Sequence, residues 1–114
     1  MLPATSRLKS DAEFGEVFKK GKSAEGRFIK IKFFLAKKGP SRFGFVVGAK
    51  FAKSAVRRNL IKRRLRAAAR LLLQEIKSGF DIVVWPKREA LRAKPAELAE
   101  DFKKLLIKND LLFI

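Results

Sequence analysis

Residues 53–70 read KSAVRRNLIKRRLRAAAR, a run with eight lysines and arginines and no acidic residue. Apolar residues recur at helical spacing, and Ile61 and Leu65 begin a stripe that continues beyond the run. Residues three or four apart share one face of a helix. The pattern therefore predicts a helix that is capped by Ser54, ends near Lys77 and buries this stripe.

A second stripe on this helix is purely basic. Four-residue steps place on one ridge the side chains of Arg58, Lys62, Arg66 and Arg70. Like charges at that spacing cost roughly 0.2–0.5 kcal/mol per pair, and cations near the amino end oppose the helix dipole. A solvated charged face is the ordinary alternative, but such faces usually mix signs and this one does not. The ridge predicts a surface for a polyphosphate ligand.

The positive charge is concentrated in one internal block. The net charge is +17, and residues 26–74 hold 15 basic and no acidic residues, whereas the rest hold 13 basic against 11 acidic. Because the block contains apolar, strand-like segments, it belongs to a folded surface. A folded basic surface favours nucleic acid, since counterion release supplies affinity. A membrane surface is less favoured, because the basic helix lacks an apolar face bearing Trp or Phe.

Composition excludes several kinds of chemistry. The chain has no cysteine, hence no disulfide or thiolate metal site, and no histidine, the usual general base. Its acids are scattered, and it has neither a glycine-rich phosphate loop nor a nucleophile beside a base. We predict no catalytic residue and no metal ligand. The length of 114 residues, without an apolar run long enough to span a membrane, indicates one cytoplasmic RNA-binding domain over 1–114.

Two flanking segments predict ordinary amphipathic helices. Ser10 and Glu13 have capping-box spacing and open a helix that stops at Gly21, and Pro95 opens a last helix. In both helices the acidic residues lie in the amino-terminal part and the lysines in the carboxyl-terminal part, where the helix dipole favours them. Only the central helix breaks this rule, which supports a ligand-binding role for its charge.

In residues 27–35 apolar and polar residues alternate, which predicts a strand with one buried and one solvent-exposed face. The alternation directs Ile29, Ile31 and Phe33 toward the core. The residues expected on the opposite face are Phe28, Lys30 and Lys32. Lysines beside an aromatic ring can take phosphates while a base stacks, although an ordinary solvated face fits equally well.

Residues 43–48 and 80–85 are apolar and predict two more buried strands. The order helix, strands, helix, strand, helix predicts a two-layer α+β sandwich in which helices pack on one sheet. A strand–helix–strand unit around the basic helix indicates that two strands are parallel.

Phe14 and Phe18 lie four residues apart on one face of the first predicted helix. Core packing is the commonest reason for such a pair, and composition alone favours it. Yet the chain has 11 Phe and no Tyr, and a domain of this size need not bury them all. Beside a basic sheet face they would instead stack bases of single-stranded RNA, worth roughly 1–3 kcal/mol per base.

Several blocks together resemble the protein subunit of bacterial ribonuclease P. Residues 58–63, RNLIKR, resemble that family's Arg-Asn-Arg motif within its longer basic signature, and Arg66 continues the pattern. The blocks FGEVFKKG at 14–21, FGFVV at 43–47 and GFDIVV at 79–84 resemble its first helix and core strands. They keep the family's order and spacing across residues 7–108.

The resemblance implies a mixed central sheet in the order α-β-β(-β)-α-β-α with a left-handed β-α-β crossover, like the second domain of a small-subunit ribosomal protein. It also implies an RNA subunit that uses Mg²⁺ to cleave precursor tRNA and release the 5′ leader. The protein would contact this catalytic RNA and the leader, with no dedicated metal site and no obligate protein partner.

The resemblance also implies site residues. Those that match the motif and are expected to contact the RNA subunit are Arg58, Asn59, Lys62, Arg63 and Arg66. The basic residues around them extend this expected contact to Lys50, Lys53, Arg57 and Arg70. Those expected to contact the leader are Phe14, Phe18, Phe28, Lys30 and Lys32. For the phenylalanine pair, the resemblance thus favours leader contact over a purely core role.

The chain departs from the family pattern at a few positions. Leu60 stands where the motif has its second arginine, which predicts a weaker contact there, Ala52 replaces a common glycine, and Lys32 replaces an aromatic found in some members. The absence of Tyr, His and Cys leaves an ancestral, consensus or designed origin open. The alternative functions are a general RNA-binding or ribosomal-type module and an inactive engineered scaffold of the same fold.

Overall fold

The computed structural model describes residues 4–37 and 39–113. The elements follow in the order η1 (Ala4–Ser6), α1 (Asp11–Lys20), β1 (Lys22–Glu25), β2 (Ile29–Leu35), β3 (Arg42–Phe45), α2 (Ala55–Leu72), β4 (Phe80–Pro86), η2 (Arg88–Arg92) and α3 (Pro95–Lys108). This order confirms the predicted α+β class. β1 is the strand that the sequence left open, because its residues KSAE show no apolar alternation.

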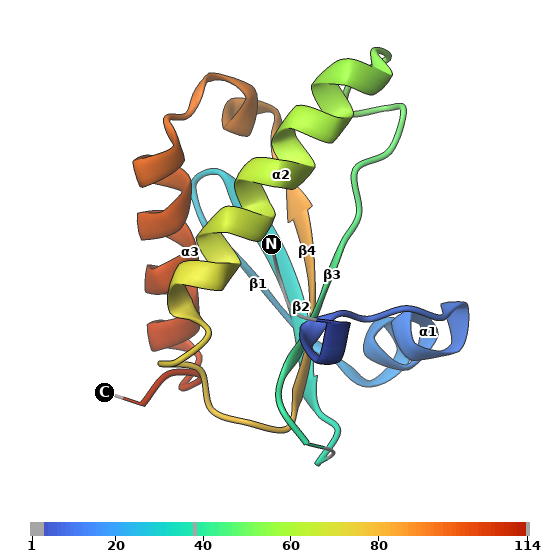
Figure 1. The fold of residues 1–114 in the computed structure, drawn as a ribbon, viewed down its shortest axis with the longest axis vertical. Helices are drawn as coiled ribbons and strands as arrows, with labels where there is room; N and C mark the ends of the chain where they lie inside the picture. The colour runs from blue at the N-terminus through green and yellow to red at the C-terminus, as the bar shows by residue number, and fades with distance from the viewer. Residues whose placement is uncertain (1–3, 38, 114) are drawn as a thin grey trace.

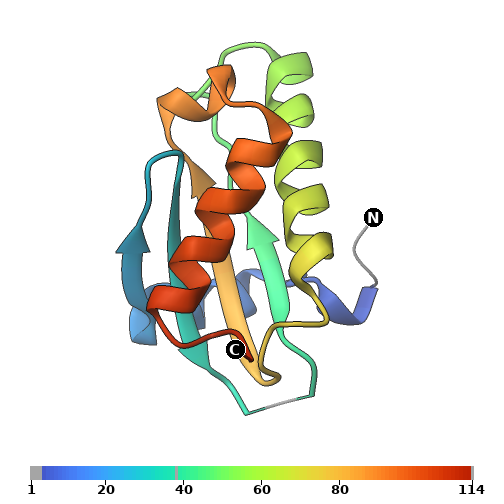
Figure 2. The ribbon, with the colours of Figure 1, turned by 90° about the vertical axis from the view of Figure 1, so that its left-hand side faces the viewer.

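The four strands form one mixed sheet in the order β1-β2-β4-β3. β2 runs antiparallel to β1 and β4, whereas β3 and β4 are parallel and are joined through α2. With the helices α2 and α3 in front and β3 and β4 pointing up, β4 lies to the left of β3 (Figures 1 and 2). The connection is therefore left-handed, against the usual right-handed rule, as the resemblance implied.

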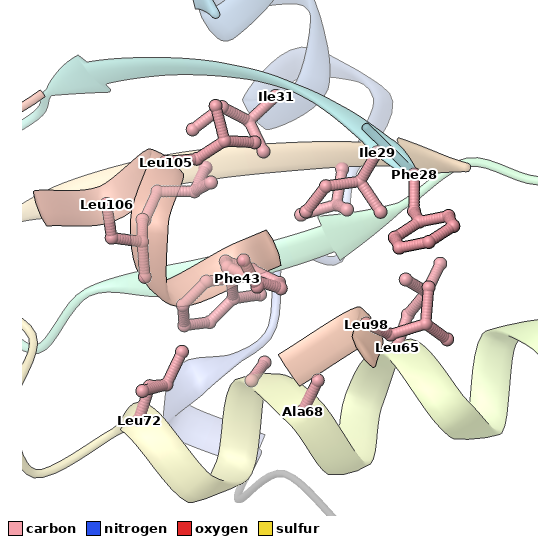
Figure 3. Close-up of a cluster of buried hydrophobic side chains, with 14 of the residues drawn as sticks. Phe28, Ile29, Ile31, Phe43, Leu65, Ala68, Leu72, Leu98, Leu105 and Leu106 are labelled. Carbon is pink, nitrogen blue, oxygen red and sulfur yellow. The ribbon is translucent and has the colours of Figure 1, made fainter. Parts of the chain in front are cut away.

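α2 and α3 cover one face of the sheet and form the main core with it (Figure 3). Its fully buried side chains include Ile29, Ile31, Phe43, Ile61, Leu65, Ile82, Leu98, Phe102 and Leu106. Burying each such side chain is worth about 1.5–3 kcal/mol. The stripe predicted on the basic helix is confirmed as its buried face.

α1 packs on the opposite face of the sheet (Figure 1). A smaller core lies beneath it, in which Leu8, Val17 and Val83 are buried. The predicted capping box is present, since the Glu13 N–H donates to Ser10 Oγ at 3.2 Å and the Ser10 N–H donates to Glu13 Oε1 at 3.0 Å. The two faces of the sheet are thus covered unequally, by two helices on one side and one short helix on the other.

α2 ends at Leu72 rather than near Lys77, so the predicted helix end is wrong. The residues that follow pair with the end of the chain: Ile76 forms a β-bridge with Leu112, and the Lys77 N–H donates to the Leu111 carbonyl at 2.8 Å. Ile76 stays buried in the main core because of this pairing. Helical periodicity could not reveal a partner so distant in sequence.

Phe28 does not share a face with Lys30 and Lys32, so that expectation is also wrong. Its side chain is only 7% exposed and belongs to the main core, on the side of α2 and α3 (Figure 3). β2 begins at Ile29, and Phe28 lies in the bend before it. The two-residue alternation holds only within the strand, so it does not extend to Phe28.

A buried carboxylate on α3 holds that bend in place. Asp101 accepts the backbone N–H groups of Arg27, Phe28 and Ile29 at 2.9, 2.9 and 3.2 Å. Gly26 lies against the same carboxylate, where a Cβ would overlap its oxygens. Three charge-assisted hydrogen bonds therefore fix the direction of the Phe28 ring.

Candidate nucleic-acid interface

The cations of α2 have no acidic partners among the described residues. The ion pairs there use Lys20, Arg42, Lys77, Lys87, Lys103 and Lys104. None of these lies on α2, whose first turn also lacks an acidic residue. The repulsion along this helix is therefore not relieved by protein charges, and a bound polyanion would relieve it.

The residues predicted to contact the RNA subunit lie on α2 and in the loop before it. The exposed ones are Lys50, Lys53, Arg57, Asn59, Arg63 and Arg70, and the half-buried ones are Arg58, Lys62 and Arg66. At a rise of 1.5 Å per residue, the ridge from Arg58 to Arg70 is about 18 Å long. It can therefore follow several successive phosphates of one RNA strand.

Arg58 also has a structural role. Its Nη1 donates to the carbonyl oxygens of Ala52 and Lys53 at 2.7 and 2.9 Å, across the loop that leads into α2. A guanidinium carries five N–H groups, so others remain for a phosphate. Arg58 therefore orders the loop as well as extending the ridge.

Leu60, the departure from the family motif, does not lie on the ridge. It is 39% exposed and lines a cavity with Arg57 and Arg64 on the other flank of α2. The leucine therefore leaves the row from Arg58 to Arg70 uninterrupted and changes only the other flank.

The two phenylalanines of α1 have different surroundings. Phe14 is half-buried and lies over Gly44, where a Cβ would clash with its ring. Phe18 is 43% exposed, with its ring centroid 6.3 Å from that of Phe14 and 5.7 Å from that of Trp85. Phe14 thus belongs mainly to the smaller core, whereas Phe18 and Trp85 form a partly exposed aromatic pair.

Two lysines of β2 lie beside this pair. Lys30 is exposed and lies opposite Trp85 in the strand register, and Lys32 lies opposite Val83. Lys32 Nζ donates to the Phe18 carbonyl at 2.6 Å. Sequence patterning does not identify Trp85 as a site residue, because the apolar run 80–85 predicts only a buried strand. The register that brings Trp85 to Lys30 is set by tertiary pairing.

An ion network fastens α1 to the sheet. The Arg42 guanidinium donates to both oxygens of Asp81, at 2.9 and 2.8 Å, and to Glu13 on α1. The Glu13 carboxylate also accepts the N–H groups of Lys9 and Ser10, and these bonds, with the Arg42 charge, lower the pKa of Glu13 to about 2. Phe18, the α1 member of the aromatic pair, is therefore held on a fixed helix.

Across 4–37 and 39–113, no three His, Cys, Asp or Glu side chains gather into a group that could hold an ion. Among the helices in that part of the chain, none has both the length and the apolar character needed to cross a membrane.

The fold and its two surfaces define a class of RNA-binding protein. The fold is a mixed sheet with a left-handed crossover. One surface is a basic helix whose cations have no acidic partner among the described residues, and the other combines aromatic and lysine side chains. The family model described as Ribonuclease P matches residues 2–110. The chain therefore belongs to the ribonuclease P protein family. As a member it is a subunit of that ribonucleoprotein, acts in tRNA processing and has the ribonuclease P RNA as its partner.

Ribonuclease P proteins from other organisms align with nearly the whole length of this chain. The ribonuclease P protein component of Pseudanabaena sp. (strain PCC 6903) is 38% identical over 113 residues, which covers 98% of this chain and 97% of the relative. That of Pelotomaculum thermopropionicum is 36% identical over 104 residues, covering 91% and 92%.

Two solved structures of ribonuclease P proteins have the same fold as this chain. The Thermotoga maritima ribonuclease P protein superposes with a TM-score of 0.80 at 35% identity, covering 90% of this chain and 96% of that one. The Staphylococcus aureus ribonuclease P protein gives a TM-score of 0.83 at 26% identity, covering 95% and 98%.

Proposed function

We propose that this chain assists the ribonuclease P RNA in the magnesium-dependent removal of the 5′ leader from precursor tRNA. In this role the α2 ridge binds the RNA subunit, and the α1 face of the sheet binds the leader. We expect it to act in the cytoplasm.

The observation that carries this proposal is the placement of two different RNA-suited surfaces on opposite sides of one sheet (Figure 1). The ridge is a row of cations without aromatic side chains, which suits the phosphates of structured RNA. The Phe18–Trp85 pair, with Lys30 beside it, suits a single strand whose bases stack while its phosphates meet an ammonium group. One protein can therefore hold the RNA subunit and the leader together.

The chemistry itself would belong to the RNA. The donor set of the described residues does not fit a protein-held magnesium site, since its carboxylates form no cluster. In our proposal, the ions that activate water are held by RNA phosphates. The protein contributes binding energy and positive charge, which lowers the concentration of free Mg²⁺ that the RNA needs.

The direct test is reconstitution with a bacterial ribonuclease P RNA at low magnesium concentration. Single-turnover cleavage of precursor tRNA should be faster with the protein than with RNA alone. Equal rates would refute the proposed function.

A matched pair of substrates tests the leader contact. Precursor tRNA with a leader of several nucleotides should bind the reconstituted enzyme more tightly than the same tRNA with a one-nucleotide leader. With RNA alone this difference should shrink. A leader effect that is independent of the protein would contradict the assignment of the α1 face.

A further inference from the structure

A cavity of about 510 Å³ lies on the flank of α2 away from the ridge. It is lined by Arg57, Leu60, Ile61, Arg64, Leu91 and Arg92. The side chains come from the amino-terminal half of α2 and from η2, which lies beside it (Figure 1). Leu91 and Arg92 also line a neighbouring cavity of about 450 Å³, together with Phe51, Arg88 and Glu89.

Three guanidinium groups line this cavity, and no acidic side chain in the described part of the chain lines it with them. Among the described residues, Arg57, Arg64 and Arg92 form no ion pair and donate no side-chain hydrogen bond. Elsewhere in the same molecule Arg42 binds two carboxylates. Two acids, Glu89 and Glu97, line neighbouring cavities together with Arg92, and among the described residues neither forms an ion pair with any of the three arginines. Gathering three cations around one cavity brings no gain to folding, so an anionic ligand is the natural complement.

This flank is separate from the ridge. Arg57 and Arg64 are seven residues apart, so they lie two turns apart on one side of the helix. Between this side and the ridge runs an outward-facing strip with the exposed residues Val56, Arg63 and Ala67, of which only Arg63 is charged. Val56 is 75% exposed. The two basic surfaces therefore face different sides of α2, and one straight row of phosphates cannot run along both.

We propose that the cavity is a second RNA phosphate site, which binds a segment of the ribonuclease P RNA backbone different from the segment on the ridge. The inference rests on the RNA partnership of this family. Guanidinium forks match phosphate oxygens bidentately, and Leu60 and Leu91 provide an apolar floor for the sugar edge. α2 then lies between two RNA segments.

Leu60, which departs from the family motif, lines the same cavity. The motif arginine that Leu60 replaces would point into this cavity. Arg57, three residues before it, and Arg64, four residues after it, border the same space and supply positive charge there. In this chain the charge of the flank is thus carried by residues one turn away on either side.

Salt dependence of RNA binding tests the site. The triple variant R57Q/R64Q/R92Q should lower the slope of log affinity against log salt by up to about three phosphate equivalents, roughly 0.7–0.9 units each. The matched control K103Q/K104Q/K108Q removes the same charge from α3 and should change the slope much less. Equal slopes for the two triple variants would overturn the proposal.

Leu60 offers variants that keep all three arginines. Leu60→Arg should tighten RNA binding several-fold, and Leu60→Glu should weaken it by a larger factor. A gain in affinity cannot result from misfolding. Unfolding midpoints near that of the unsubstituted chain would complete the control, and an unchanged affinity for both variants would count against the site.

A positional experiment separates the two flanks. The chain has no cysteine, so Asn59→Cys and Leu60→Cys each give a unique attachment point for an iron chelate that cleaves nearby RNA. Asn59 lies on the ridge side, and Leu60 lines the cavity. The two tethers should cut non-contiguous segments of the RNA subunit. Cuts in one shared segment, or none from position 60, would overturn the second site.

The cleavage pattern of the two tethers tests the second site whether or not the proposed function is correct. If the unsubstituted protein fails to stimulate precursor-tRNA cleavage, the proposed function falls, and the two-segment footprint still decides the second site. If it stimulates cleavage but both tethers cut one segment, only the second site is refuted.

Discussion

The ammonium group of Lys32 donates a 2.6 Å hydrogen bond to the carbonyl oxygen of Phe18. This carbonyl belongs to the last turn of α1, where backbone oxygens have no partner within the helix. The bond ties the end of α1 to β2 and holds Phe18 over Trp85. Lys32, predicted as a leader contact, therefore also positions an aromatic ring of the candidate leader site.

Replacing Lys32 with methionine removes this donor but keeps the length of the side chain. We expect the free energy of unfolding to fall by about 0.5–1.5 kcal/mol, because the helix end loses its cap, and leader affinity to fall as well. Lys30→Met is the matched control: it removes the same charge from the same face without touching α1. Urea unfolding should separate the two variants, and an equal loss of stability would contradict the positioning role.

Phe18→Ala should weaken leader binding by about 1–3 kcal/mol, the range for one stacked base. Because the side chain is 43% exposed, the loss of thermal stability should be smaller than for Phe14→Ala in the smaller core. Trp85 is the only tryptophan of the chain, so its fluorescence reports directly on the pair. A large drop in melting temperature with normal leader binding would assign Phe18 to the core instead.

The triple replacement by glutamine of Lys62, Arg66 and Arg70, the ridge residues other than Arg58, should weaken binding to the RNA subunit. The slope of log affinity against log salt should flatten by up to about three phosphate equivalents. Arg58 is left in place because its bonds to two backbone carbonyls make it part of the loop structure. Binding titrations at several salt concentrations provide the measurement, and an unchanged slope would exclude the ridge as the contact.

Acid should weaken the attachment of α1 through Glu13. The pKa of Glu13 is lowered from 4.5 to about 2, first by the N–H groups of Lys9 and Ser10 and then by Arg42. The folded state thus binds fewer protons than the unfolded state between these values, so the contribution is complete above about pH 4.5 and lost as the pH falls toward 2. We expect about 1–2 kcal/mol, reduced by solvent screening because the side chain is 29% exposed.

Urea unfolding between pH 6 and pH 2 checks this expectation. Glu13→Gln should lower stability at pH 6 and flatten the fall in acid. Glu16→Gln, whose ion pair with Lys20 is exposed, should leave the profile nearly unchanged. A Glu13→Gln protein that loses stability in acid as steeply as the unsubstituted protein would contradict the expectation.

Asp101→Ala should be strongly destabilising. It leaves the N–H groups of Arg27, Phe28 and Ile29 without their acceptor, and each unsatisfied buried group costs about 1–3 kcal/mol. We expect a total loss of about 2–4 kcal/mol, since water can reach part of the bend. The neighbouring exposed Glu100→Ala should change stability by less than about 0.5 kcal/mol. Similar losses for the two variants would argue against the carboxylate's role.

Most features that depend on local sequence are predicted correctly, although the end of α2 is not. The capping box of Ser10 and Glu13, the cap of α2 at Ser54 and the apolar stripe through Ile61 and Leu65 are all present. The basic ridge follows from the same helical period. Each depends on residues a few positions apart, so a linear pattern contains the necessary geometry.

The sequence by itself thus determined the three α-helices, the strands β2, β3 and β4, the buried stripe of α2 and, through a family resemblance, the crossover. Only the tertiary structure decided that Phe28 enters the main core, because Asp101, more than 70 residues away in sequence, turns the bend before β2. It likewise placed Trp85 beside Lys30 and gathered Arg57, Arg64 and Arg92 around one cavity. These relationships depend on strand register and on segments that meet only in the folded chain, so no local periodicity encodes them.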